Sequence, residues 1–139
     1  PIEVQQPLVM VMHHVVWGDV EAAMNTYAAA NANRPGFSFL CSSPYRFASE
    51  IYPRLAGHAA SGGQVYVISG DGGQYKKSYA YQSTDGVQFL ITGINNSVDT
   101  TLFTPGRPFN FDPDSILLLT NDHGQLSHQF VRLDEWVDQ

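Results

Sequence analysis

Basic residues are scarce in this sequence, and they do not cluster. Only seven of the 139 residues are Lys or Arg, and Lys76 and Lys77 are the one adjacent pair among them. A nucleic-acid-binding protein usually carries a basic stripe that displaces counterions from phosphates, and an anionic membrane attracts the same kind of cluster. Because the formal net charge is also −6, we expect neither nucleic acid nor a charged membrane surface as a partner.

Cysteine is almost absent, and long apolar runs are absent. Cys41 is the single cysteine, so an intramolecular disulfide is excluded and the redox compartment is not indicated. The longest apolar runs, such as Leu8–Met12 and Ile116–Leu119, are far shorter than the ~20 residues that span a bilayer, and neither lies in a signal-peptide arrangement. We predict no membrane span, and export would have to use a route without a visible signal peptide.

The residues that are present are those of a packed protein. Apolar side chains make up 43% of the chain and charged ones 14%, which is too apolar and too weakly charged for a disordered chain. The length is close to that of one typical domain, and no repeat, low-complexity tract or linker interrupts it. We therefore expect one globular domain over residues 1–139.

The N-terminal part of the chain carries a strand signal and then a helix signal. Leu8–Trp17 has the Val- and Met-rich composition of a buried strand. Asp19 can cap the N-terminus of a helix that runs from Val20 to about Ala30. The pattern thus predicts a strand followed by a helix.

A strand–helix–strand unit follows between Gly36 and Ser69. Phe37–Cys41 and Gln64–Ser69 have the composition of short apolar strands. The helix between them has three apolar residues at the spacing of one helical face, namely Phe47, Ile51 and Leu55. Pro53 predicts a kink or a restart within this helix, and Gly57 predicts its end.

Beyond this unit the sequence is mostly β. Tyr75–Gln82 and Val87–Ile94 flank Asp85-Gly86, a strong signal for a two-residue hairpin turn. A second turn sequence separates Ser115–Thr120 from a last strand near His128–Leu133. We therefore predict an α+β fold, in which two helices of the N-terminal half pack on a mostly antiparallel sheet and the C-terminal half is β-rich.

Two groups of side chains have both a chemical and an ordinary structural interpretation. His13 and His14 end the first strand, where one of them could contact a substrate or both could form an exposed edge pair. Acidic residues gather later in the chain beside a histidine, namely Asp112, Asp114, Asp122 and His123. They lack the spacing of known metal sites and suit ordinary turns, so no metal site is expected.

Cys41, His128 and Asp134 occur in the order of nucleophile, base and orienting acid that papain-like cysteine hydrolases and deamidases use. A nucleophilic thiolate gains from a position at a helix N-terminus. Cys41, however, precedes the expected helix cap by two residues and lies in an apolar strand. A buried structural cysteine is therefore the alternative interpretation, and both stay open.

Four segments between Val15 and Ser69 succeed one another in an order that a known family shares. They are Val15–Asp19, Phe39–Ser43, Phe47–Tyr52 and Val65–Ile68. In turn they resemble the end of the first strand, the serine-bearing segment, the helix after it and the Val-Tyr-x-Val strand of bacterial toxin-type mono-ADP-ribosyltransferases. The resemblance implies an effector or toxin domain that binds NAD as a substrate.

The resemblance also implies which residues would bind NAD. Ser42, Ser43 and Tyr66 would contact the dinucleotide, and a branch of the family uses a histidine to hold it. His13 and His14 are the candidates for that histidine, with His13 assigned to NAD binding and His14 to catalysis.

The catalytic carboxylate implied by the resemblance is Asp85. A carboxylate is needed there because transfer from NAD passes through an oxocarbenium-like centre whose positive charge it stabilises. Gly86 matches the position of the family's glutamate, with Asp85 beside it, and Gly18 matches the position of its arginine. An active transferase or NAD glycohydrolase and a degenerate, non-catalytic NAD site are therefore both open.

Three functions remain at this point. The first is the ADP-ribosyltransferase-like domain, which would act on or bind a protein target. The second is a non-catalytic protein-recognition module, which the low charge and the many Tyr, Asn and Gln residues suit. The third is the cysteine hydrolase or deamidase.

Overall fold

The computed structural model describes residues 6–13, 15, 17, 20, 46–70, 78–93 and 114–135, and the structural statements below concern these residues. Four strands form one sheet in the order β1-β2-β4-β3. Their bounds are Leu8–Met12 for β1, Val65–Ser69 for β2, Ser78–Gln82 for β3 and Gln88–Thr92 for β4. β1 and β4 both run parallel to β2, whereas β3 runs antiparallel to β4.

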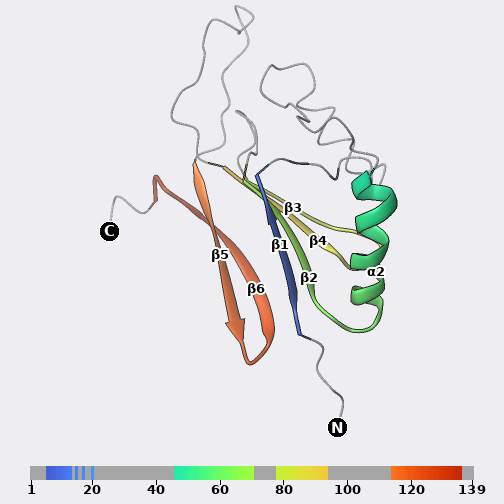
Figure 1. Ribbon diagram of the computed structural model, residues 1–139. Helices are drawn as coiled ribbons and strands as arrows, with labels where there is room; N and C mark the ends of the chain where they lie inside the picture. The colour runs from blue at the N-terminus through green and yellow to red at the C-terminus, as the bar shows by residue number, and fades with distance from the viewer. Residues whose placement is uncertain are drawn as a thin grey trace, which may run out of the picture.

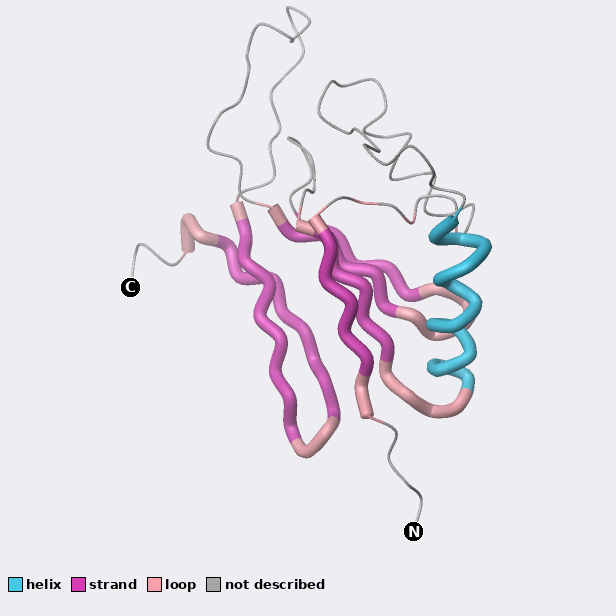
Figure 2. Tube along the Cα trace, in the orientation of Figure 1, coloured by secondary structure: helices cyan, strands magenta, loops and turns pink. Residues whose placement is uncertain are grey.

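Helical and β layers cover the two faces of this sheet. One turn of π-helix, η1 (Phe47–Ile51), continues into the α-helix α2 (Tyr52–Ala60). The hairpin of β5 (Ser115–Asp122) and β6 (Gln125–Arg132) is a separate two-stranded sheet. Figures 1 and 2 show α2 on one side of the four-stranded sheet and the hairpin on the other, with β1 in front.

Strand β2 lies at the centre of these layers. All five of its residues are buried, as its nearly uninterrupted apolar sequence favours, because a strand covered on both faces has no solvated side. Val65 and Val67 belong to the core under the helix, and Tyr66 and Ile68 to the core under the hairpin. The two cores therefore meet at one strand.

The core on the helix side is built around aromatic rings. Trp17 lies 4.9 Å from Phe89 between ring centroids, and Phe47 meets the same ring edge-on at 6.4 Å. The indole Nε1–H of Trp17 donates to the hydroxyl of Ser69 over 3.0 Å, and both residues are buried. This bond ties the chain beyond β1 to the end of β2.

The hairpin is fastened to the sheet near both of its ends. The side chain of Gln64 bonds both backbone groups of Leu126: its Nε2 donates to the carbonyl, and its Oε1 accepts from the N–H. At the other end Gly93 bridges to Ser115, and the Thr92 hydroxyl donates to the Ser115 carbonyl over 3.0 Å. Between these ends the hairpin packs on the sheet through Leu117, Leu126 and Phe130.

The α+β class is confirmed, but two details of the expected architecture need correction. The described residues contain one continuous helical segment, 47–60, whereas the helix expected from Val20 to about Ala30 lies, apart from Val20, outside them. The four-stranded sheet is mixed rather than mostly antiparallel, because β1 and β2 are joined by a crossover that includes α2. The strand expected at Phe37–Cys41 also lies outside the described residues.

The helix changes from π- to α-helical geometry beside Pro53, where a kink or a restart was expected, and the expected stop at Gly57 is wrong. Pro53 lies in the first turn of α2, directly after the π-helical turn η1. The helix continues to Ala60 and ends in a Schellman motif, in which Gly62 at φ 92° and Gly63 donate to the carbonyls of Ala59 and His58. A glycine favours the end of a helix where the backbone must adopt the left-handed conformation, as Gly62 does here. Gly57 keeps the helical conformation, so the helix continues through it.

Both predicted hairpins form, with turns that differ in length. Ser83 and Val87 close the β3–β4 loop through a backbone bond of 2.9 Å, so three residues span it rather than two. The β5–β6 turn consists of His123 at φ 49° and Gly124 at φ 87°. Two consecutive left-handed residues make a type I′ turn, which matches the twist of the flanking strands.

Replacing the acceptor of the Trp17 bond should destabilise the protein. In Ser69→Ala the buried indole N–H loses its partner, and we expect unfolding to become easier by about 1–3 kcal/mol. Urea denaturation measures the change. Ser127→Ala, on the exposed face of β6, is the control and should stay within about 0.5 kcal/mol of the wild type. Equal stability of the two variants would contradict the role given to this bond.

Relieving the left-handed residue of the β5–β6 turn should stabilise the protein. Asparagine adopts positive φ more readily than histidine, so His123→Asn is expected to gain about 0.5–1 kcal/mol. Thermal denaturation checks this against Gln125→Asn, which makes the same side chain at an extended position. A loss of stability in His123→Asn would show that the turn has another geometry.

Candidate functional site

The structure places the described candidates for NAD chemistry at two ends of the sheet. His13 follows the carboxyl end of β1 and is exposed. Asp85 lies in the loop that precedes β4. Because β1 and β4 run in the same direction, these positions are separated by a strand length, on the order of 16 Å for five residues. His13 and Asp85 are therefore not brought together.

Asp85 is engaged with the helix layer. Its carboxylate accepts a hydrogen bond of 2.7 Å from the hydroxyl of Tyr52 in α2. Glu50, a second carboxylate that could serve in place of Asp85, forms an exposed pair with Arg46, which lies one helical turn before it at 4.0 Å. Both carboxylates thus have partners on or beside the helix.

Tyr66 is an anchor for the hairpin in this structure. Its side chain is buried, its ring lies edge-on to His128 at 6.0 Å, and its hydroxyl donates to the Leu126 carbonyl over 2.9 Å. Burial raises the pKa of the Tyr66 hydroxyl above its ordinary value of 10.0, so the group stays protonated at neutral pH. The described geometry gives it a packing role.

The remaining candidates of the NAD site, His14, Ser42 and Ser43, lie outside the described residues, and so does Cys41. The other two residues of the hydrolase hypothesis, His128 and Asp134, are described. His128 faces the sheet, between the rings of Tyr66 and Phe130, while Asp134 lies beyond the end of β6.

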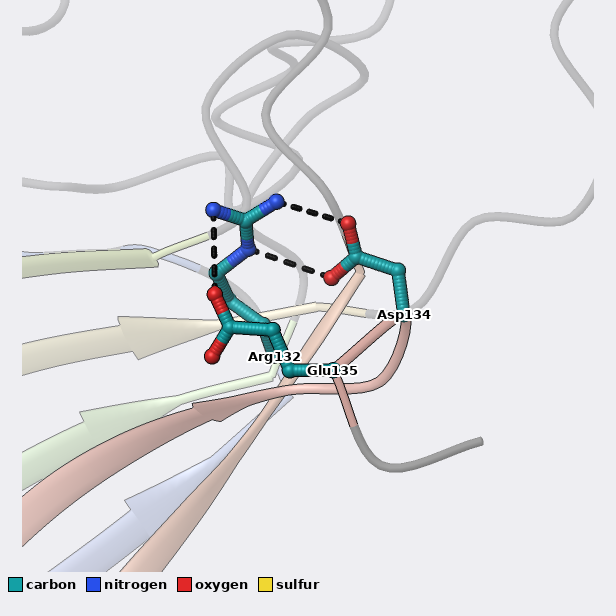
Figure 3. Close-up of polar contacts among 3 residues, drawn as sticks. All are labelled: Arg132, Asp134 and Glu135. Carbon is teal, nitrogen blue, oxygen red and sulfur yellow. Dashed lines mark hydrogen bonds and ion pairs between the residues drawn. The ribbon is translucent and has the colours of Figure 1, made fainter. Parts of the chain in front are cut away.

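Asp134 has a different partner, shown in Figure 3. Arg132 donates to both carboxylate oxygens of Asp134, over 3.1 Å and 2.6 Å, and its third nitrogen lies 3.2 Å from Glu135. The hydrogen bond from Arg132 lowers the pKa of the Asp134 carboxyl. His128 is separated from Arg132 by about 13 Å of extended strand. The structure therefore does not pair His128 with Asp134.

The described residues offer neither a metal site nor a membrane-spanning helix. Within those ranges, no group of three or more His, Cys, Asp or Glu side chains could hold a metal ion. In the same part of the chain, no helix combines the length and the apolar character that crossing a membrane requires.

The feature that sequence reasoning missed is the open edge of β1. The Leu8 N–H donates to the Gln64 carbonyl, and the Met12 carbonyl accepts from the Gly70 N–H. In a parallel ladder alternate residues bond to the same neighbour, so Leu8, Met10 and Met12 turn their backbone groups toward β2. The N–H and C=O groups of Val9 and Val11 consequently point away from the sheet, where no described strand pairs with them.

The side chains along this edge are apolar and accessible. Val11 is 72% exposed, Leu8 40% and Val9 38%. The register pairs Val9 with Tyr66 and Val11 with Ile68, so both valines lie on the hairpin side of the sheet, beyond the area that the hairpin covers. The expectation that this strand is buried is therefore wrong: β1 is an edge strand, and an apolar run does not reveal which position a strand takes.

Native proteins usually protect such an edge with charges, bulges or proline. Residues 8–12 contain no charged side chain, and they pair with β2 without a bulge. Pro7 has no N–H to donate, so the outward donors begin at Val9. We call the outward backbone groups and side chains of Val9 and Val11 the β1 edge. It can form backbone hydrogen bonds with a further strand.

Comparison of the chain with protein-family models, with curated proteins and with solved structures gives no match. The proposals below therefore rest on the geometry of the described residues.

The role of Tyr66 can be tested without any ligand. Tyr66→Phe removes a partly buried bond to the hairpin and should destabilise the protein by about 0.5–1.5 kcal/mol. Tyr52→Phe removes an exposed bond that water replaces, so this variant should lose less stability.

The stability of the protein should also depend on pH through Tyr66. Because the folded state raises the pKa of Tyr66, stability should fall as pH rises above 10, and this fall should shrink in Tyr66→Phe. Urea denaturation at several pH values measures both effects, and identical profiles for wild type and Tyr66→Phe would contradict this role.

Proposed function

We propose that this protein is a non-catalytic recognition module that binds an extended segment of a partner protein at the β1 edge. The outward N–H and C=O groups of Val9 and Val11 carry the proposal. They form the pattern on which β-augmentation depends, in which main-chain bonds give affinity and alternate side chains give specificity.

The chemistry of the edge defines the partner. A bound strand would place every second side chain beside Val9 and Val11 on the hairpin side, and the others beside the half-buried Met10 and Met12 on the helix side. Neither side offers a charge within residues 8–12. The partner segment is therefore uncharged and extended, with β-branched residues at alternate positions.

The NAD-binding function implied by the family resemblance is the competing proposal. It receives less support from the described residues, because His13 and Asp85 lie at opposite ends of the sheet and Tyr66 has its hydroxyl engaged. NAD titration separates the two: a bound ligand at 100 times its Kd stabilises a protein by about 2.7 kcal/mol. A saturable stabilisation by NAD would favour the NAD-binding proposal, whether or not catalysis follows.

Binding at the β1 edge can be measured with a short labelled peptide. The probe is the uncharged peptide Ser-Thr-Val-Thr-Val-Thr-Ser with blocked ends, whose fluorescence anisotropy should rise on titration with the wild-type protein. Val11→Lys should weaken binding at least tenfold, because a lysine on an edge strand opposes pairing. Leu118→Lys, which makes the same change at an exposed leucine on the outer face of β5, should bind as the wild type does.

A backbone variant separates strand pairing from apolar contact. Val11→Pro removes an outward N–H and no bond to β2, so the fold should be retained while peptide binding is lost. Circular dichroism checks the fold. Equal binding by Val11→Pro and wild type, or no binding by the wild type, would overturn the proposal. So would a wild-type dimer that Val11→Lys dissolves, since the occupant would then be a second copy of the chain.

A further inference from the structure

The four-stranded sheet and the hairpin both present uncovered apolar side chains to the space between them. Leu119 lies on the face of β5 that turns toward the sheet, because it alternates with Leu117, which packs there. A leucine on such a face is normally covered, yet Leu119 is 38% exposed. On the sheet, Val11 turns toward the hairpin layer and is also exposed. Neither of these two side chains is covered by the layer that it faces.

The two uncovered side chains adjoin the same residue, Ile68. Ile68 is the partner of Val11 in the ladder of β1 and β2, so the two side chains lie next to each other on one face of the sheet. Ile68 also lines, together with Leu117 and Leu119, an open pocket where β5 meets the ends of β2 and β4. The apolar surface therefore continues from Val11 across Ile68 to the sheet-facing side of β5.

A strand bound at the β1 edge would have its side chains at the margin of this space. Such a strand extends the sheet by one position, about 4.8 Å beyond β1. It places the side chain opposite Val11 about 5 Å from that valine on the hairpin side, and an aromatic side chain also reaches neighbours roughly 7–8 Å away. A ring at this position can therefore lie across Val11 toward Ile68.

The separation of the layers decides which side chain fits there. Stacked β layers lie about 10 Å apart, and interdigitating side chains of both layers fill that distance. A valine opposite Val11 would be too short to reach across to the hairpin layer, so Leu119 would stay exposed. A phenylalanine ring supplies the missing bulk. No side chain that lines the pocket is charged, so a ring without a charge suits it.

We infer that the partner strand carries a large aromatic side chain at the position opposite Val11, and that this ring is buried against Leu119. The inference rests on the proposed strand pairing at the β1 edge and narrows the sequence class of the partner. Aromatic residues lie on the hairpin side of the bound strand. β-branched residues alternate with them and lie beside Met10 and Met12 on the helix side.

Two peptides that differ only on the hairpin side test this preference. They are Ser-Thr-Val-Thr-Val-Thr-Ser and Ser-Thr-Phe-Thr-Phe-Thr-Ser, both with blocked ends. Because both valines are replaced, a phenylalanine stands opposite Val11 whichever way the bound strand runs. The wild-type protein should bind the phenylalanine peptide about tenfold more tightly, since the larger ring removes more apolar surface from water. Fluorescence anisotropy measures both affinities.

Neighbouring leucines on opposite faces of β5 provide a variant and its matched control. Leu119→Thr should bind both peptides within about twofold of each other, and its affinity for the valine peptide should equal that of the wild type, which shows that the fold and the β1 edge are intact. Leu118→Thr makes the same change on the outer face of β5 and should keep the tenfold preference.

A second measurement depends on no variant. In the complex of the wild-type protein with the phenylalanine peptide, nuclear Overhauser effects should connect the ring protons to the methyl groups of Leu119. Their absence, or a preference that survives in Leu119→Thr, would overturn the inference. Equal affinity of the wild type for the two peptides would overturn it and leave strand pairing standing, whereas failure of both peptides to bind would overturn strand pairing as well.

Discussion

The burial of β2 on both faces is the constraint on which the rest of this structure depends. A five-residue strand whose side chains are all buried needs a layer on each side, and the chain supplies a helix for one and a hairpin for the other. Polar bonds add to the packing on both sides of β2: Ser69 accepts from Trp17 on the helix side, and Gln64 bonds the backbone of Leu126 on the hairpin side. These directed bonds fix the orientation of the neighbouring segments on β2, which apolar contact alone does not fix.

The same constraint explains where free surface remains. The hairpin packs on β2 and β4 through Tyr66, Ile68 and Leu90, and β1 extends beyond the area it covers. Exposed valines and outward backbone groups are the consequence at that edge. An open pocket lies on the same side of the sheet, where β5 meets the ends of β2 and β4.

The sequence predicted local elements well because their signals are local. The β2 run, the helix before it and both hairpins were predictable from composition, apolar spacing and turn residues. The position of a strand within the sheet was not predictable from the sequence. Leu8–Met12 is as apolar as a central strand, and only the order of the strands in the sheet shows that it lies at an edge. The site expectations depended on strand direction in the same way: His13 and Asp85 could share a cleft only if β1 and β4 ran in opposite directions, and they are parallel.

Amide hydrogen exchange at single-residue resolution, with and without a bound strand-forming peptide, tests the central claim most directly. In the free protein the account predicts slow exchange at Met10 and Met12, whose N–H groups face β2, and fast exchange at Val9 and Val11. Added peptide should slow the exchange of Val9 and Val11 and leave Met10 and Met12 unchanged. Equal protection of all four amides in the free protein, or no change at Val9 and Val11 on binding, would contradict an open β1 edge that accepts a strand.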